Sequence, residues 1–403
     1  MERVLELKAQ GPPLTDLVRE RRTLLRDPAL ARIADKLVAG ERLDHADGLA
    51  VLRTGDVPGA GLLADAVRTA RHGDYTYFVC NRQINPTDYC VLDCCFCDYA
   101  RRPHDPAGYE MSMDEILAHC ADGIREVHIT GGLHPRWKYD HYLEIVRRIR
   151  QSHPSVQIKA YTAVEIDFFT RLARKSVAEV LADLREAGLD ALPGGGAEVF
   201  SERVRKLLFP RKTGAERWLE IHRTAHEMGI PSNATLLYGH VETYAERVEH
   251  VLRLRALEDE APGFLAFIPL AFQPGTTGIR TRPAPPDEDL RTLAMSRLLL
   301  DNVPHIKAYW VMLGEETASV GLAFGASDLD GTVGVERIAH AAQADSPLGL
   351  ARERLVAMIR EAGRIPVERD ALYRVVRVYG RRAGDAETGG GGAGPAPTEA
   401  APA

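Results

Sequence analysis

The chain has 403 residues, and its 51 Lys and Arg against 57 Asp and Glu give a net charge of −6. A chain of this length can bury a large core, as one large barrel or as two domains. Acidic and basic residues are interspersed, so neither nucleic acid nor an anionic membrane is expected as a partner. The N-terminus has no apolar signal segment, and no uninterrupted apolar run of about 18 residues predicts a transmembrane helix.

The cysteine content indicates where the protein works. Six cysteines in a large chain without a secretion signal do not suggest a disulfide framework. We therefore expect a cytoplasmic protein with reduced thiols.

The first part of the chain reads as helical. Between residues 14 and 75, apolar side chains recur at near-helical spacing. Examples are Leu17, Leu24, Leu25, Leu30, Ile33 and Leu37. We expect residues 1–74 to form an N-terminal helical extension.

From residue 75 onward, strand-like runs alternate with amphipathic helices, which is typical of a parallel α/β fold. The predicted strands are 75–83, 126–130, 157–163, 189–192, 232–237, 264–272, 305–312 and about 322–329. Predicted helices between them include 112–120, 139–151, 176–187, 214–228 and 287–302. Eight such units predict a closed (β/α)8 TIM-type barrel over residues 75–375. An open six-stranded barrel is the alternative, because the last strand is poorly marked.

The chain ends in a low-complexity tail. Residues 383–403 are rich in Gly, Pro and Ala. Such a composition cannot bury a core, so we expect this tail to be disordered.

Cys90, Cys94 and Cys97 follow the first predicted strand with the spacing Cys-x3-Cys-x2-Cys, and Phe96 precedes the last of them. Three thiolates can hold three irons of a [4Fe–4S] cluster and leave the fourth iron without a protein ligand. The open iron can chelate a small molecule and pass it an electron. An aromatic residue before the last cysteine is typical of radical S-adenosylmethionine (SAM) enzymes. We therefore predict that these cysteines hold the cluster and that SAM chelates its open iron.

A structural zinc site is the weaker interpretation. Zinc needs four ligands, and Cys80, Cys95 and Cys120 form no second Cys-x-x-Cys pair. We take Cys95 as a bystander, because adjacent side chains rarely reach one cube together. His222 and His226 lie one turn apart on a predicted amphipathic helix, where a solvated or core-edge pair is expected.

The second predicted strand ends in the pair Gly131-Gly132. Glycines let backbone approach a ligand closely, and their carbonyls can receive an ammonium group. After a radical SAM cysteine loop, this pair matches the element that holds the amino group of SAM, with Phe96 near the adenine. Further polar contacts to SAM are predicted for Tyr161, Glu165 and Asn233, each of which could equally have a structural role.

Beyond the cysteine motif, residues 30–375 resemble the aminodeoxyfutalosine synthase family, which belongs to the futalosine route to menaquinone. The resemblance lies in residues 85–87, 127–135, 158–166, 192–198, 233–240, 305–314 and 328–333. It implies a transferase in which the 5′-deoxyadenosyl radical adds to 3-[(1-carboxyvinyl)oxy]benzoate. Aryl migration and loss of a carboxylate then give 6-amino-6-deoxyfutalosine, with methionine released. It also implies an external electron donor, such as flavodoxin or ferredoxin.

That substrate carries two carboxylates on a flat ring, so its pocket needs cationic groups and apolar walls. The candidates at strand ends are Arg82, Lys159, Lys307, His134 and His240, with Tyr309 and Trp310 as walls. We expect Lys159 and Lys307 to face the carboxylates, although lysines in strands often extend to a solvent-exposed rim.

Two other functions stay open at this point. One is a related radical SAM cyclase acting on dehypoxanthine futalosine, which would abstract hydrogen and release free 5′-deoxyadenosine. The other is an iron–sulfur regulator without turnover, although no basic helix–turn–helix pattern is visible. The adenosyl-containing product distinguishes these possibilities.

Overall fold

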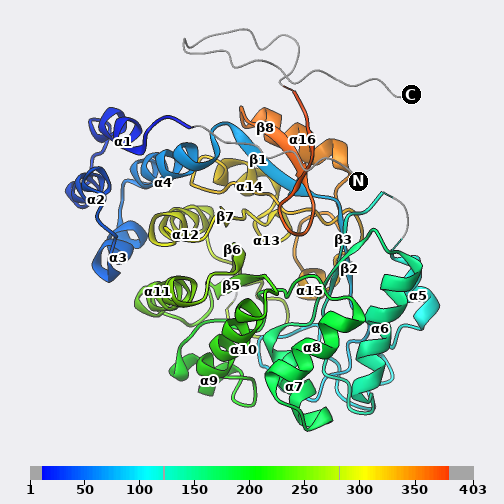
Figure 1. Ribbon diagram of the computed structural model, residues 1–403. Helices are drawn as coiled ribbons and strands as arrows, with labels where there is room; N and C mark the ends of the chain where they lie inside the picture. The colour runs from blue at the N-terminus through cyan, green and yellow to red at the C-terminus, as the bar shows by residue number, and fades with distance from the viewer. Residues whose placement is uncertain (1–10, 121–122, 281, 381–403) are drawn as a thin grey trace, which may run out of the picture.

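Parallel strands alternate with helices through most of the computed structural model, which describes residues 11–120, 123–280 and 282–380 (Figure 1). The tail predicted to be disordered, 383–403, lies outside the described residues. The strands are β1 (Tyr75–Val79), β2 (Asn81–Ile84), β3 (Glu126–Ile129), β4 (Gln157–Ala160), β5 (Ser232–Tyr238), β6 (Phe264–Ala271), β7 (His305–Ile306), β8 (Ile365–Arg369) and β9 (Val375–Val378).

These strands form three-stranded sheets with the orders β1-β8-β9, β2-β3-β4 and β5-β6-β7. Pairing is parallel throughout, except between β8 and β9. Single parallel bridges connect one sheet to the next. They are Lys159 with Ala191, Leu192 with Ser232, Lys307 with Asp328, and Tyr77 with Asp328. The predicted α/β class is therefore confirmed.

The predicted strands differ from the observed ones at several places. The run 75–83 is two strands, and the segments 189–192 and 322–329 make only isolated bridges. The run 305–312 ends as a strand at Ile306, because α13 (Trp310–Leu313) begins soon after. A short buried apolar run has no periodicity that separates strand from helix. Strands β8 and β9 were not predicted.

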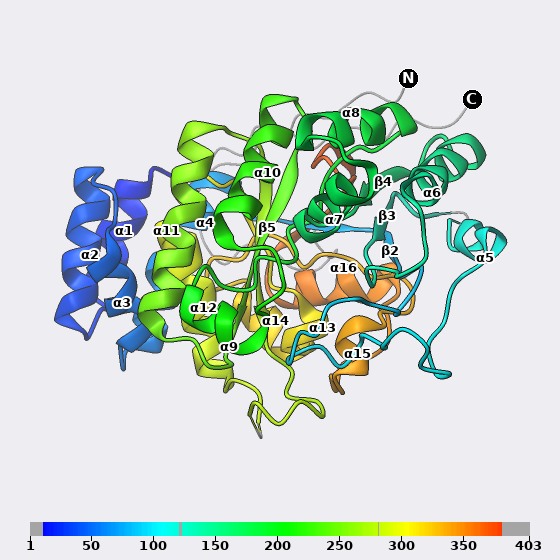
Figure 2. The same cartoon turned by 90° about the horizontal axis from the view of Figure 1, so that it is seen from below.

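The helical reading of residues 14–75 is confirmed. This segment forms α1 (Leu14–Arg22), α2 (Pro28–Ala39), α3 (His45–Arg53) and α4 (Val57–His72). Helices α3 and α4 pack on α12 (Pro286–Leu299), and α3 also packs on α11 (Tyr244–Glu260). Figure 2 shows α1, α2 and α3 at one side of the molecule, next to α11.

The remaining helices surround the strands (Figure 1). They are α5 (Met113–Ala118), α6 (Tyr139–Ser152), α7 (Ala163–Ala173), α8 (Val177–Ala187), α9 (Glu202–Leu208), α10 (Ala215–Glu227), α14 (Glu315–Gly321), α15 (Ile338–Ala341) and α16 (Arg352–Glu361). Helices α5, α7, α8 and α11 each begin with a capping box, in which a Ser or Thr and a Glu satisfy the free backbone N–H groups.

Within the described residues, several ion pairs are buried among the strands, and three of them have short contacts. They are Lys159 with Glu126 at 2.9 Å, Lys307 with Asp330 at 3.0 Å, and Arg369 with Asp328 at 2.6 Å. The amide of Asn81 lies 3.5 Å from the Glu126 carboxylate and 3.3 Å from that of Asp330. Buried charges are tolerated when they are paired and hydrogen-bonded, as these are.

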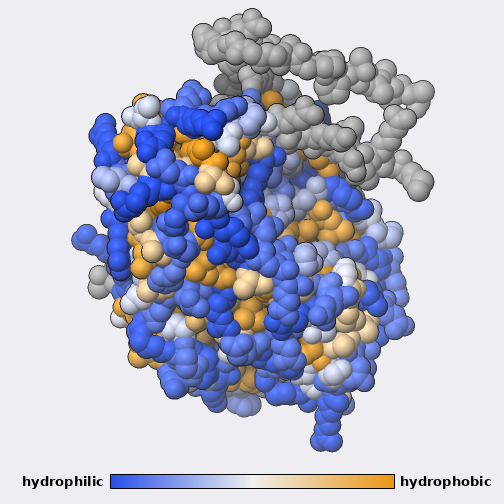
Figure 3. Space-filling model, turned by 60° about the vertical axis from the view of Figure 1, so that its left-hand side comes forward, coloured by the Kyte–Doolittle hydropathy of each residue, from blue (hydrophilic) through white to orange (hydrophobic). Residues whose placement is uncertain are grey.

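The outer surface is mixed in polarity. On the face seen in Figure 3, apolar residues occur in small groups among hydrophilic ones. The large apolar side chains that are exposed include Leu172, Leu207 and Val320, which come from α7, α9 and α14. In the part of the chain that the structure describes, none of the helices combines the length and apolar character needed to cross a membrane.

Replacing Arg369 by Met should strongly destabilise the fold, because it leaves the Asp328 carboxylate buried without its cation. We expect the free energy of unfolding to fall by about 3–5 kcal/mol, measured by urea denaturation followed by circular dichroism. The matched control is Arg22→Met, which removes an exposed ion pair with Asp35. That variant should unfold almost like the parent, and equal losses in both would contradict the prediction.

Candidate active site

A cavity of about 330 Å³ opens at the carboxyl ends of the strands, where parallel α/β enzymes place their sites. The side chains of Cys90, Cys94 and Cys97 all line it. They belong to the segment between β2 and α5, drawn in cyan, which passes next to α15 in Figure 2. Ile338 and Ala339 of α15 line the same cavity. The structure thus brings the predicted cluster ligands together at the predicted end of the strands.

Hydrogen bonds hold the cysteine loop in place. The Cys90 N–H donates to the Arg101 carbonyl at 2.9 Å, and the Cys97 N–H donates to the Cys94 carbonyl at 3.2 Å. The Asp98 carboxylate accepts from the backbone N–H of Thr276 at 2.6 Å and from its hydroxyl at 2.7 Å. This contact connects the cysteine loop to the loop that follows β6.

The three thiols fit an iron–sulfur cluster. None of them is in a disulfide. Burial raises the pKa of Cys94 to about 12 and also raises the pKa of Cys97, although the N–H groups of Ala100 and Tyr99 favour the Cys97 thiolate. Thiolates in such surroundings need a positive partner, which iron supplies. Cys90, Cys94 and Cys97 would hold the cluster, and its chemistry there would be one-electron reduction of SAM.

The arrangement does not favour a zinc site. Among the described residues, no three Cys, His, Asp or Glu side chains are placed to share a single metal ion. A cube does not require that, because each thiolate binds a different iron. Cys95 is exposed, and its N–H donates to the Leu208 carbonyl at 2.8 Å. His222 and His226 are buried, and each ring lies 2.8 Å from the Ser232 hydroxyl, so the pair is part of the core and not solvated.

The glycine pair packs against the cysteine loop. A Cβ on Gly132 would lie 2.2 Å from the Tyr89 carbonyl oxygen, and one on Gly131 would lie 2.9 Å from that of Thr87. The Gly132 N–H donates to the Thr87 carbonyl at 2.9 Å. Glycine is therefore required here for backbone packing. Both glycines also line the cavity, and their contact with the amino group of SAM stays a prediction.

Glu165 lines the cavity from the first turn of α7. Its carboxylate accepts from the Thr162 N–H at 2.7 Å, the Thr130 hydroxyl at 3.2 Å and the Gly131 N–H at 3.3 Å. Burial nevertheless raises the pKa of Glu165 to about 7, because the ionised form loses water that these donors only partly replace. The site therefore holds a carboxyl group that exchanges a proton near neutral pH.

Phe96 also lines the cavity and lies next to an ion pair that the sequence did not reveal. Its ring makes an edge contact with Phe209 at 5.7 Å, and the Lys212 ammonium lies 5.2 Å from its centre. Burial opposes the Lys212 charge, but the ion pair with Glu198 raises the pKa of Lys212 above its usual range. Lys212 is the only Lys or Arg among the described cavity residues.

Two residues predicted to contact SAM lie outside the cavity lining. Tyr161 is buried, and its hydroxyl donates to the Tyr142 carbonyl at 2.8 Å. Asn233 is buried too, and its side-chain oxygen has no hydrogen-bond partner within the described ranges. The structure does not bring these two residues to the cysteines.

Arg82 and His134, predicted for the substrate carboxylates, are also not among the residues that line the cavity. The Arg82 guanidinium donates to the His119 carbonyl at 3.3 Å. His134 lies 3.0 Å from the Glu110 carboxylate through Nε2, and its Nδ1 accepts two backbone N–H groups of the following loop. Both ring nitrogens of His134 are thus engaged in holding that loop.

Lys159 and Lys307 do not line the cavity either. Lys159 is paired with Glu126, and Lys307 is paired with Asp330. Of these four residues only Asp330, the partner of Lys307, reaches the cavity wall. Burial opposes its ionisation, but Lys307 and Arg369 hold the pKa of Asp330 below its usual range. The sequence pattern located the lysines on the strands but not their partners.

Further wall residues came from positions that the sequence reading passed over, namely Gln83 on β2 and His128 on β3. Both are half-buried, and each lies two residues after a buried polar residue, Asn81 or Glu126. Polar side chains two apart within a buried strand point to the same face. That period was a signal available in the sequence. Of the walls predicted, Tyr309 lines the cavity, whereas Trp310 donates to the Gly331 carbonyl from within the core.

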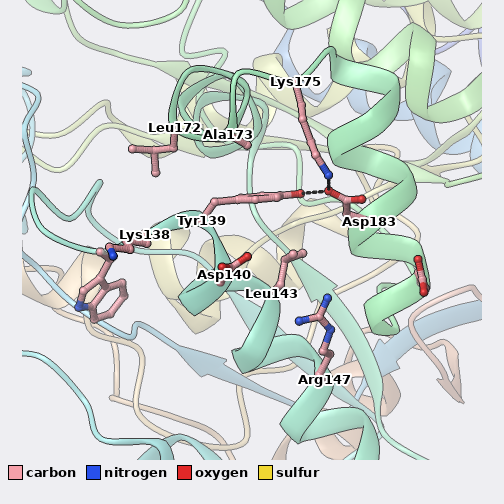
Figure 4. Close-up of a pocket in the computed structure, with 11 residues that line it drawn as sticks. Lys138, Tyr139, Asp140, Leu143, Arg147, Leu172, Ala173, Lys175 and Asp183 are labelled. Atoms are coloured by element: carbon pink, nitrogen blue, oxygen red, sulfur yellow. Dashed lines mark hydrogen bonds and ion pairs between the residues drawn. The ribbon is translucent and has the colours of Figure 1, made fainter.

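A second, larger hollow of about 550 Å³ lies between α6 and the α7–α8 region. Figure 4 shows that its Tyr139 hydroxyl and Lys175 ammonium both point at the Asp183 carboxylate, at 2.9 Å and 2.5 Å. None of the three predicted ligand cysteines lines this hollow. Tyr139, Lys175 and Asp183 satisfy one another there, and the hollow has no cysteine in its lining.

Comparison with known proteins agrees with this site. Residues 84–254 match the Radical SAM superfamily, and residues 261–380 match the CofH/MqnC C-terminal region. The chain is 48% identical to an aminodeoxyfutalosine synthase of Thermus thermophilus, over 89% of this chain and 98% of that protein. This chain belongs to the aminodeoxyfutalosine synthase family of radical SAM enzymes. A family member from Streptomyces coelicolor is 41% identical, over 88% of this chain and 96% of that protein.

A solved structure gives independent support for the fold. Methylornithine synthase (PylB) superposes with a TM-score of 0.68 at 18% identity, over 83% of this chain and 97% of that one. At this identity the likeness concerns the fold alone.

Cys94→Ala should remove the cluster, because a cube with two protein thiolates loses one of its anchors. We expect a large loss of bound iron and of the brown absorbance after anaerobic reconstitution. Cys95→Ala is the matched control, since that thiol is exposed beside the cavity, and it should retain iron like the parent. A Cys94→Ala protein with full iron content would contradict the assignment.

The raised pKa of Glu165 should contribute to the pH dependence of the free energy of unfolding. Between pH 4.5 and 7 Glu165 binds a proton more strongly in the folded state than in the unfolded state, so its contribution to the free energy of unfolding falls as pH rises through this range. The shift corresponds to a loss on the order of 3 kcal/mol. Relative to the parent, Glu165→Gln should make the slope of the stability–pH curve more positive in this range, measured by urea denaturation of metal-free protein. An unchanged slope would show that Glu165 titrates normally.

Proposed function

We propose that this chain synthesises 6-amino-6-deoxyfutalosine from SAM and 3-[(1-carboxyvinyl)oxy]benzoate. The observation that carries the proposal is the single cavity lined by all three cysteines, in a chain 48% identical to an aminodeoxyfutalosine synthase over nearly its whole length. When bound, the cluster and SAM would supply the 5′-deoxyadenosyl group that adds to the vinyl methylene. Aryl migration from oxygen to carbon and loss of one carboxylate complete the conversion, with methionine released.

The walls of the cavity suit a flat aromatic substrate and a reactive adenosyl group. Apolar side chains cover much of the lining, namely Leu92, Val164, Leu237, Ile268, Leu270, Phe272 and Met312. They would contact the ring and keep water away from the reacting carbon atoms. Binding both reactants between these walls would hold the vinyl group near the adenosyl carbon.

The arrangement of strands supports a closed (β/α)8 barrel over residues 75–375. The isolated bridges at Ala191, Leu192 and Asp328 place two further segments between the sheets, where the fourth and eighth strands of a barrel would lie. Residues before 75 would then be an outer helical extension.

Six free thiols are in keeping with a reducing compartment such as the cytoplasm, where flavodoxin or ferredoxin would supply electrons.

Anaerobic incubation of reconstituted enzyme with SAM, a reductant and the carboxyvinyloxy benzoate tests this function. We expect 6-amino-6-deoxyfutalosine and methionine in equal amounts by mass spectrometry. Methionine with free 5′-deoxyadenosine alone would contradict addition chemistry. Conversion of dehypoxanthine futalosine instead would favour the cyclase, and an inert protein with an intact cluster would favour a regulator.

A further inference from the structure

Two polar side chains lie next to each other in the wall of the cysteine-lined cavity. Gln83 of β2 and His128 of β3 are register partners in the parallel β2–β3 pair, and both line the cavity. Register partners in neighbouring strands point to the same face. The Gln83 amide and the His128 imidazole therefore face the same part of the cavity.

These two residues differ from other polar residues of the wall. Most of those groups are already hydrogen-bonded within the protein: Asp98 to Thr276, Thr130 and Thr162 to Glu165, Glu198 to Lys212, Thr235 to Gly194, Gln273 to Met312, and Asp330 to Lys307. Within residues 11–120, 123–280 and 282–380, neither the Gln83 amide nor the His128 ring has a hydrogen-bond partner. Polar groups in a largely apolar pocket are costly unless a ligand engages them.

The charges beneath the pair are balanced. Lys159, the register partner of His128 on β4, is paired with Glu126, and Lys307 is paired with Asp330. Neither lysine is available to an incoming anion without breaking a buried ion pair. Burial, and to a smaller extent the Lys159 ammonium, lowers the pKa of His128 to about 4. At neutral pH the ring is thus an uncharged donor, like the Gln83 amide.

The pair lies deeper than the groups around the cysteines. His128 precedes Thr130 by two residues on β3, which corresponds to about 7 Å along the strand. A ligand whose reacting carbon lies near the cysteines would reach Gln83 and His128 with its far end. In a 3-substituted benzoate, the ring separates the carboxylate from the vinyl ether, so the benzoate carboxylate is the group at that far end.

We propose that Gln83 and His128 bind the benzoate carboxylate of the substrate, each through one N–H donor. This rests on the proposed function and names the residues that select its substrate. Hydrogen bonds to a carboxylate are stronger than those between neutral groups, so two neutral donors can fix it without a buried cation. The other carboxylate, which is lost in the reaction, would lie next to the vinyl carbon near the cysteines.

The test compares the substrate with an analogue that lacks only the benzoate carboxylate. This analogue is the 1-carboxyvinyl ether of phenol. The parent enzyme should prefer the full substrate in kcat/KM. Gln83→Leu and His128→Leu should each lower that preference about ten- to hundredfold and weaken substrate binding measured by calorimetry. Their effect on the analogue should be small, which a merely structural role of the side chains would not produce.

Two further variants guard against misfolding as an explanation. His128→Gln keeps an N–H donor and should retain most of the preference, whereas Gln83→Glu places a carboxylate against a carboxylate and should lose it. Iron content equal to the parent establishes that a variant is folded. Turnover with an unchanged preference in both leucine variants would overturn the assignment. Absence of turnover in the parent would instead contradict the proposed function.

Discussion

Charge balance inside the strands is the constraint on which the rest of the site depends. Lys159, Lys307 and Arg369 are matched there by Glu126, Asp328 and Asp330, and the Asn81 amide lies between two of the carboxylates. A single unmatched charge at this depth would cost several kcal/mol. The pair of Lys159 with Glu126 connects β4 to β3, that of Lys307 with Asp330 connects the residue after β7 to the segment 328–330, and that of Arg369 with Asp328 connects this segment to β8. Of these six charged residues Asp330 lines the cavity, so the pairs adjoin the site.

These buried ion pairs show which parts of the site could be predicted from the sequence and which could not. The cysteine spacing is a local pattern that reports its chemistry directly, so Cys90, Cys94 and Cys97 were identified without any tertiary information. The role of Lys159 could not be, because its partner Glu126 is on another strand. A lysine in a strand carries the same local signature whether it meets a ligand or a carboxylate. Knowledge of register across β3 and β4 was needed to separate these cases.

The fold shows the same division between local and tertiary information. Helices α5 and α8, which have a capping box, each begin one residue after the predicted start, because caps are local. The predicted bounds of the strands were less accurate. The segment 189–192 contributes single bridges to β4 and β5, and β8 is defined by its pairing with β1. Whether such segments form strands depends on their pairing with distant strands. Neither hydrophobic periodicity nor composition reports that pairing.

The close packing of Gly132 on the Tyr89 carbonyl has a consequence for assembly. The ligand loop packs on the residues that follow β3 through the backbone contacts of Gly131 and Gly132, and these contacts restrict the shapes that the loop can take. A binding site ordered in advance does not lose conformational entropy a second time when its ligand arrives. The contacts of Gly131 and Gly132 would therefore reduce the conformational entropy that the loop loses when iron and sulfide are inserted after translation.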